Sequence, residues 1–430
     1  MRNIGTRTLL ILLLLLLICS LQASENSPTP TVSALAPHRI ILTWNADPAH
    51  SQAVSWRTDT FGAKAVAQIA NANSGPIVET KAKTVNGITT RVRMGVERVA
   101  AHNRVVFDSL EPATEYIYRV GDGKQWSDWN SFRTADTSAA PFSFIYLGDS
   151  QDDGRSGWSL ALRAAIARNP SARFIAFAGD LVEEGYDDAL WDKWCLAHDF
   201  ISAGVPVVPA PGNHDLFRSP TATDPIHVLS VSALWNLHFA LPMNGPDARE
   251  LRGQAYYFDY QGVRFIVIDP NVWANQDFVR RKKSRIASRQ LTWLEAVLRN
   301  NPNRWTIVMQ HQPMYPITNK IVPEMQAALV PLYDKYGVDI VLQGHDHIYS
   351  RTHKLLAGNK VSAADAGTYY VTSVSGPKMY RYTKQNAELM EKVIENTQMF
   401  QTIDVSPHAL TFHAYSIDGL TLDSFKIEKE

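Results

Sequence analysis

The sequence predicts an α/β domain preceded by a small all-β domain, and three features of the chain indicate this arrangement. Residues 38–135 carry short alternating segments separated by turn signals such as Asn86-Gly87, with no clear helical stretch. Residues 136–430 instead alternate apolar strands with helical patterns, which is the rhythm of an α/β fold. At 430 residues and 45% hydrophobic content, the chain is long enough to bury the cores of two domains.

The N-terminus predicts an exported protein. Two arginines and no acid precede an unbroken Leu/Ile run, Leu9–Ile18, and a small residue follows at Ala23. This pattern is typical of a secretory signal peptide over residues 1–23, and the Ser-, Pro- and Thr-rich residues 24–37 then form a predicted linker. Lipid attachment at Cys19 and an uncleaved anchor are alternatives, but the run is short for a membrane span and Ile18 is bulky for a lipidation site. We expect a secreted or periplasmic protein with no transmembrane span after removal of the signal.

The charge composition gives no sign of a polyanionic partner. Lys+Arg and Asp+Glu are equal at 42 each, so no bulk field favours nucleic acid or an anionic membrane. We therefore expect no nucleic-acid partner. One basic cluster, Arg280–Lys283 with Arg285, is predicted to lie in a loop before an amphipathic helix that begins at Ser288. It could be a phosphate-binding lip or a solvated face, and we favour the solvated face.

The all-β part has one recognisable segment, Leu110–Val120. It resembles the signature that leads into a late strand of fibronectin type III domains, in which a tyrosine hydroxyl ties the corner to the backbone. The resemblance implies a fibronectin type III-like β-sandwich over residues 38–135. Trp126 and Trp129 could form an aromatic binding surface there, or they could pack against the sandwich edge or the neighbouring domain, and we favour packing.

Five apolar strands in residues 136–430 share one feature: each ends in a glycine or a short polar step, and Asp, Asn or His follows at once. The strands are expected at Phe142–Leu147, Phe174–Ala178, Val205–Ala210, Trp305–Met309 and Val338–Leu342. The motifs that follow them are Gly148-Asp149, Gly179-Asp180, Gly212-Asn213-His214-Asp215, Gln310-His311 and Gly344-His345-Asp346-His347. Because ligands of open α/β sheets bind outside the carboxyl ends of the strands, we expect these polar side chains to converge.

The converging side chains have the chemistry of a metal site. They supply carboxylate, amide oxygen and imidazole but no thiolate, and they are Asp149, Asp180, Asn213, His311, His345 and His347. This set suits iron, manganese or zinc and does not select among them. Six such ligands exceed the needs of one tetrahedral ion, so two ions that share a carboxylate are the simplest solution. Taken alone, the His345 and His347 pair could equally be hydrogen-bonded core residues; the other four strand ends favour metal.

These motifs, in this order, resemble the motif set of calcineurin-like metallophosphoesterases. With the preceding β-sandwich, the mature chain is similar to purple-acid-phosphatase-type enzymes. The resemblance implies two facing sheets flanked by helices, and hydrolysis of phosphate esters at a two-metal centre. Carried over residue by residue, it implies that Asp180 bridges the ions, that Asp149 and His347 hold one ion, and that Asn213, His311 and His345 hold the other.

His214 matches the family histidine that contacts the substrate. The hypothesis is that metal-activated hydroxide attacks phosphorus and that His214 protonates the leaving oxygen, since imidazole is suited to that transfer near neutral pH. Alternatively, His214 holds Asp215 or a loop carbonyl. Gln151, Asp215 and Arg351 are candidate substrate or outer-shell residues, although Arg351 could equally pair with an acid.

Two residues depart from the family pattern. Purple acid phosphatases have a tyrosine three residues after the bridging aspartate, where this chain has Glu183, so a ferric preference and a purple colour are not expected. Other family branches have a histidine at the position of Gln151, whose amide oxygen could ligate weakly or orient a water. The ion next to Asp149 is therefore predicted to have fewer ligands. Two other functions stay open: a metal- or phosphate-binding protein with little catalysis, and a surface adhesion protein.

Overall fold

The computed structural model describes residues 34–60, 64–75, 77–94, 98–151, 157–216, 231–274, 280–318 and 321–430. The predicted signal peptide, residues 1–23, and most of the predicted linker lie outside the described residues. Within the ranges given, every helix is too short or too polar to cross a membrane.

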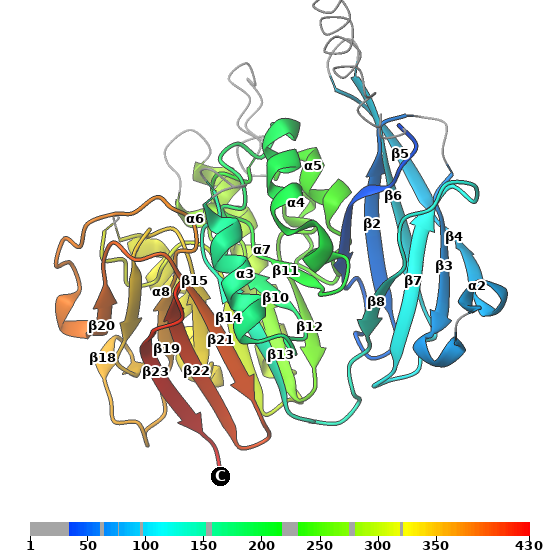
Figure 1. The fold of residues 1–430 in the computed structure, drawn as a ribbon. Coiled ribbons are helices and arrows are strands. Elements are labelled where there is room, and N and C mark those ends of the chain that lie inside the picture. The colour runs from blue at the N-terminus through cyan, green and yellow to red at the C-terminus, as the bar shows by residue number, and fades with distance from the viewer. Residues whose placement is uncertain are drawn as a thin grey trace, which may run out of the picture.

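The N-terminal part is a sandwich of two four-stranded antiparallel sheets, drawn in blue and cyan in Figure 1. One sheet has the order β1 (His38–Thr43), β2 (Gln52–Thr58), β6 (Arg98–Phe107), β5 (Ile88–Met94). The other has the order β4 (Lys83–Asn86), β3 (Val66–Asn71), β7 (Glu115–Gly121), β8 (Asn130–Arg133). A short 3-10 turn, η1 (Ala72–Ser74), and one turn of helix, α2 (Val78–Lys81), depart from the strictly all-β prediction.

Two details of this sandwich bear on the sequence analysis. The hydroxyl of Tyr116 accepts a hydrogen bond of 2.9 Å from the backbone N–H of Glu111, which is the corner tie expected at this segment. The guanidinium carbon of Arg119 lies 4.8 Å from the ring centre of Trp126 and 4.6 Å from that of Trp129. Both rings are half-buried and pack on Arg119. The two tryptophans therefore pack at the edge of the sandwich, which is the alternative that we favoured.

The remainder of the chain forms two mixed sheets. The first, of six strands, has the order β11 (Val207–Pro209), β10 (Ile175–Phe177), β9 (Phe142–Leu147), β21 (Met399–Val405), β22 (Ala409–Ser416), β23 (Thr421–Glu428). The second, of seven strands, has the order β12 (Tyr256–Tyr260), β13 (Val263–Val267), β14 (Trp305–Met309), β15 (Ile340–Gln343), β19 (Tyr369–Thr372), β16 (Tyr349–Thr352), β20 (Met390–Ile394). A small hairpin joins β17 (Leu355–Leu356) to β18 (Asn359–Lys360).

Aromatic side chains fill the space between the two sheets. Phe144 and Phe174 stack with ring centres 4.8 Å apart, and Phe258 and Phe265 stack at 5.0 Å on the opposite side. Phe144 meets Phe265 edge to face at 5.4 Å, which joins the two layers. Strands β9, β13 and β14 are buried on both faces, as expected for strands whose sequences are continuous hydrophobic runs.

Helices cover the outer faces of the sheets (Figure 1). The six-stranded sheet carries α3 (Trp158–Arg168) and α4 (Asp188–Ser202), beside α5 (Ala233–His238). The seven-stranded sheet carries α7 (Arg280–Arg299) and α8 (Pro323–Tyr336), with α6 (Asn271–Ala274) and the 3-10 turns η3 (Arg249–Leu251) and η5 (Ala387–Leu389) in the connections. Two facing sheets flanked by helices are the architecture that the sequence predicted.

One local prediction was wrong. The basic cluster Arg280–Lys283 is not a loop, because helix α7 begins at Arg280 and continues to Arg299. Its first buried apolar residue, Ile286, comes only after six residues. An all-polar first turn has no hydrophobic periodicity, so the sequence pattern located the helix start too late.

Candidate metal centre

Six polar side chains from the ends of five strands meet at one edge of the two sheets. Asp149, Asp180 and Asn213 follow β9, β10 and β11 of the six-stranded sheet. His311 and His345 follow β14 and β15 of the facing sheet, and His347 lies two residues beyond His345. The contacts below join these residues across the gap between the sheets.

The first half of the cluster gathers around His311. Its Nε2 lies 3.1 Å from Asp180 Oδ2, 3.2 Å from Asn213 Oδ1 and 3.2 Å from His345 Nδ1. The ligand atoms of Asp180, His311 and His345 all lie within 4.8 Å of one another, as required to share an ion. The carbonyl of Ala178 can only accept, so His311 donates its Nδ1 proton there, at 2.8 Å, and keeps Nε2 available as a ligand.

The second half contains Asp149 and His347. His347 Nε2 lies 3.2 Å from Asp149 Oδ2, and His347 donates its Nδ1 proton to the carbonyl of Lys378 at 3.0 Å. Gln151 is buried beside them, with its Nε2 3.4 Å from His347 Nε2. Gln151 Oε1 is one of several buried polar atoms of the described residues that have no hydrogen-bond partner. A buried oxygen without a donor is what a bound cation would satisfy.

Backbone amides fix one oxygen of each carboxylate and leave the other for the cluster. The N–H of His345 donates to Asp149 Oδ1, and the N–H of His214 donates to Asp180 Oδ1, both at 2.8 Å. These approaches require glycine: a Cβ on Gly344 would lie 2.3 Å from Asp149 Oδ1, and one on Gly212 would lie 2.1 Å from Asp180 Oδ1.

Two of the six converging residues have a strained backbone. Asp180 has a φ of 49° and His345 a φ of 70°, in the left-handed region that non-glycine residues seldom adopt. Such conformations persist where the surrounding structure imposes them, and they concentrate at functional sites.

Two further acids beside the converging residues, Asp346 and Asp215, accept hydrogen bonds from backbone amides of the loops. Asp346 Oδ2 accepts hydrogen bonds from the N–H groups of Ile317 and Thr318, at 2.7 Å and 3.0 Å. Asp215 accepts from the N–H of Leu181 at 3.1 Å and from that of Gly212 at 2.8 Å. Asp215 therefore links the loop that follows Asp180 to the loop that carries Asn213.

The electrostatics of the cluster favour a positive charge. Burial alone would lower the pKa of His311, but the carboxylates of Asp180 and Asp149 outweigh it and raise that pKa to about 10. Burial, followed by the charge of His311, lowers the pKa of His345 to about 4. Burial would raise the pKa of Asp149 and of Asp180, yet both are lowered, chiefly by His311. The donor set thus fits a cation.

His214 lies at the rim of the cluster, with its side chain 23% exposed. Its Nδ1 donates to the carbonyl oxygen of Glu183 at 2.7 Å, and Glu183 Oε1 is 3.5 Å from the same nitrogen. Of the alternatives for His214, a loop carbonyl rather than Asp215 is its Nδ1 partner. This bond leaves Nε2 available for a substrate.

Family comparisons cover both parts of the chain. A family model described as the purple acid phosphatase N-terminal domain matches residues 37–134, and one described as calcineurin-like phosphoesterase matches residues 142–349. The chain is a calcineurin-like protein of the purple-acid-phosphatase type. All six converging side chains lie within the second match.

Individual relatives agree with this family. Purple acid phosphatase 21 of Arabidopsis thaliana is 29% identical over 283 residues, covering 64% of this chain and 58% of that protein. Human acid phosphatase type 7 is 26% identical over 341 residues, covering 74% of this chain and 70% of that protein. The chain therefore spans less than two thirds of the Arabidopsis relative.

A solved structure shows the same fold. The purple acid phosphatase PPD1 from yellow lupin (Lupinus luteus) seeds superposes with a TM-score of 0.73 at 17% identity, covering 92% of this chain and 75% of that one. At this identity the likeness establishes the architecture of the purple-acid-phosphatase-type chain and not its substrate.

Two residues near the cluster were missed by sequence reasoning. The ring of Tyr380 lies 4.6 Å from that of His347, and Lys378 Nζ lies 3.9 Å from Glu183 Oε2. Glu183, which stands where the family has a tyrosine, thus lies between His214 and Lys378. Lys378 and Tyr380 belong to the connection after β19, which has neither periodicity nor a motif that could have identified them.

Arg351 does not join the cluster. Its Nε and Nη2 donate to Asp423 at 2.7 Å and 3.0 Å, and its Nη1 lies 2.5 Å from Glu391 Oε2. The guanidinium also lies over the ring of Phe425 at 4.7 Å. Of the two alternatives for Arg351, pairing with an acid is the arrangement in the structure, and we leave this residue out of the proposed site.

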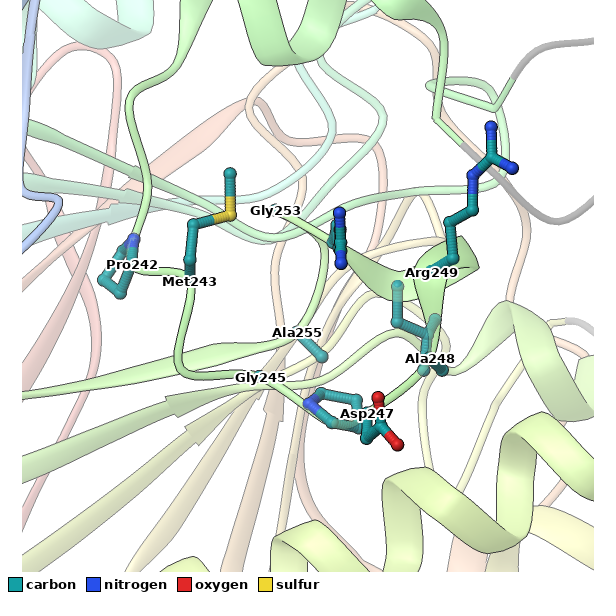
Figure 2. Close-up of a pocket in the computed structure, with 11 residues that line it drawn as sticks. Pro242, Met243, Gly245, Asp247, Ala248, Arg249, Gly253 and Ala255 are labelled. Atoms are coloured by element: carbon teal, nitrogen blue, oxygen red, sulfur yellow. The ribbon is translucent and has the colours of Figure 1, made fainter.

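A separate pocket of about 440 Å³ lies in the loop that precedes β12 (Figure 2). Residues between Pro242 and Ala255 line it, with Met243 and Arg249 on opposite sides of the hollow. None of the six converging side chains lines this pocket.

Proposed function

We propose that the protein hydrolyses phosphate esters at a centre of two metal ions. The observation that carries the proposal is the meeting of Asp180, Asn213 and His345 around His311 Nε2, next to the Asp149 and His347 pair. The phosphatase names of the relatives in Arabidopsis and human support this reaction class.

The proposed ligand assignment follows the two halves of the cluster. Asn213, His311 and His345 would hold one ion, Asp149 and His347 the other, and Asp180 would be shared. Iron, manganese or zinc ions would fit these ligands, and bound there they would polarise a phosphoryl oxygen and lower the pKa of a water.

The chain's own residues would orient the substrate and move the proton. With Nδ1 bonded to the Glu183 carbonyl, His214 presents Nε2 as the nitrogen that carries a proton to the leaving oxygen. The N–H of His214 also fixes Asp180, so the proton donor and the shared ligand are set by one short segment.

We further propose that the protein is exported, on the strength of the predicted signal peptide at residues 1–23. N-terminal sequencing of the mature protein from the extracellular or periplasmic fraction should begin near Ser24. A lipid on Cys19, detected by mass spectrometry, would contradict cleavage near Ala23.

One experiment tests the function. Metal in the purified protein is quantified, and phosphate mono- and diesters are then screened across pH. We expect about two ions per chain and hydrolysis of at least one ester class; an active protein that holds no metal would refute the proposal.

A second candidate is a metal- or phosphate-binding protein with little catalysis. It is favoured by the Asp149 half, where Gln151 stands at the position of a family histidine and presents nitrogen toward His347. Stoichiometric metal without hydrolysis of any ester would select this alternative.

A further inference from the structure

A buried ion network joins the N-terminal sandwich to helix α4. Arg39 of β1 donates to Asp188 Oδ1 at 2.8 Å, and Arg57 of β2 donates to Asp188 Oδ2 at 2.6 Å. Arg39 also donates to Asp192 Oδ1 at 3.0 Å. The side chains of Arg39, Arg57 and Asp188 are only 4%, 6% and 7% exposed, so these charges depend on one another.

Asp188 is the first residue of α4, and the network holds it ionised. Burial would raise the pKa of its carboxyl, but the guanidinium groups of Arg39 and Arg57 outweigh burial and lower the pKa to about 2. Arg39 itself has a φ of 52° at an irregularity in the pairing of β1 with β2. The strand therefore deviates from regular pairing at the residue that reaches the helix.

The other end of α4 is tied to the same sandwich. Tyr118 donates its hydroxyl proton to the carbonyl of Ala203 at 2.7 Å, and Ser202 donates to the carbonyl of Ile40 at 2.9 Å. Ala203 lies in the sandwich core. Figure 1 shows α4 standing between the sandwich and the two sheets, and both of its ends are thus set by the sandwich.

From α4, two tryptophans reach the loops of the proposed metal centre. Trp191 donates its indole proton to the carbonyl of Gly185 at 2.8 Å, and the N–H of Gly185 donates to the carbonyl of His214 at 2.9 Å. Trp194 donates to Ser150 Oγ at 3.1 Å, next to Asp149, and Ser150 donates to the carbonyl of Leu181. The loop that follows Asp180 and the loop that contains Ser150 are therefore both hydrogen-bonded to α4.

We propose that the sandwich is a positioning element of the hydrolytic site, acting through Arg39, Arg57 and Asp188 on helix α4. This inference rests on the proposed function, because the positioned groups are His214 and Asp149. A buried ion pair adds little stability over apolar packing, so this network is better explained by the single geometry that it imposes on α4. Small displacements of reacting groups are costly for rate.

The test compares Asp188→Asn with a control of the same burial. Asp423→Asn removes a carboxylate from another buried bidentate pair, with Arg351, whose side chains are each 6% exposed. Both variants are purified as full chains with metal. Two quantities are measured: amide hydrogen exchange of residues 181–187 and 212–216, and kcat and KM for a phosphate monoester.

Asp188→Asn should speed exchange in both segments about tenfold and lower kcat about tenfold, with KM within about twofold. Asp423→Asn should lose thermal stability while its exchange in these segments and its kcat stay within about twofold of the parent. If Asp188→Asn does not fold, Arg57→Gln, which removes the guanidinium whose Nη1 donates to both oxygens of Asp188, should change both quantities in the same direction.

Parent-like exchange and kcat in the Asp188 or Arg57 variant would overturn the proposal, as would equal losses in the Asp423 control. If the parent hydrolyses no ester, the proposed function fails, and the exchange measurement still decides whether the sandwich positions the loops.

Discussion

The two halves of the candidate centre differ in how much of an ion's coordination the chain itself supplies. Around His311, three further side chains offer Asp180 Oδ2, Asn213 Oδ1 and His345 Nδ1 at 3.1–3.2 Å. Around Asp149, the described residues offer His347 and the proposed shared ligand Asp180 as strong donors, and Gln151 presents Nε2 instead of an oxygen. A 180° flip of the Gln151 side-chain amide would exchange Nε2 and Oε1, so that the oxygen would face His347. We therefore expect the Asp149 half to hold its ion more weakly than the His311 half.

The largest expected effect comes from Asp180, the residue that we propose both halves share. Asp180→Ala should lose both ions together and lower kcat/KM by more than about 100-fold, since even outer-shell changes at metal sites cost about 10–100-fold. Metal analysis and hydrolysis of one ester measure this. A variant that keeps one half loaded and turns over fully would show that the halves do not share Asp180.

His214 separates proton transfer from metal binding. His214→Ala should keep the metal content of the parent but lower kcat about 100-fold or more for an alkyl phosphate, whose leaving oxygen needs a proton. The loss should be much smaller for an aryl phosphate with an acidic leaving group. Equal losses for both esters would contradict the general-acid role.

Gln151 sharpens the contrast between the halves. Gln151→His adds an imidazole at a position where other branches of the family have a histidine. The ion of the Asp149 half should then be bound about tenfold more tightly. Chelator competition followed by metal counting measures the change, with Gln151→Ala as the matched variant that should weaken the same ion. If both variants release metal as the parent does, Gln151 has no part in the centre.

The smallest functional effect is expected for Arg351, which lies outside both halves. Arg351→Met leaves Asp423 buried without its partner and should cost about 3–5 kcal/mol of unfolding free energy. KM for a phosphate ester should stay unchanged in the folded protein. A raised KM with little loss of stability would instead indicate a phosphate contact.

Strand ends were predictable because two signals coincide there. An apolar run identifies the strand and the Gly-Asp or Gly-His step marks its end, so the polar residues at the strand ends could be found from the sequence. Asp149 and His345 follow strands of two facing sheets, an arrangement that only the family resemblance implied. The metal-binding roles of these residues stay predictions.

Contacts between distant segments were not predictable in this way. Arg351 meets Asp423 across 72 residues and Arg39 meets Asp188 across 149, and neither pair has a local pattern. An irregular connection places Tyr380 beside His347, with ring centres 4.6 Å apart. Which side chains pair with each other depends on the tertiary structure, and the spacing of residues along the chain does not reveal it.

The central claim is that hydrolysis needs two ions held in unequal halves. Protein stripped of metal is titrated with manganese or zinc while ester hydrolysis and bound metal are followed together. The account predicts that the first equivalent binds tightly with little activity, and that activity rises with a second, weaker equivalent. Full activity at one equivalent, or in the stripped protein, would contradict it.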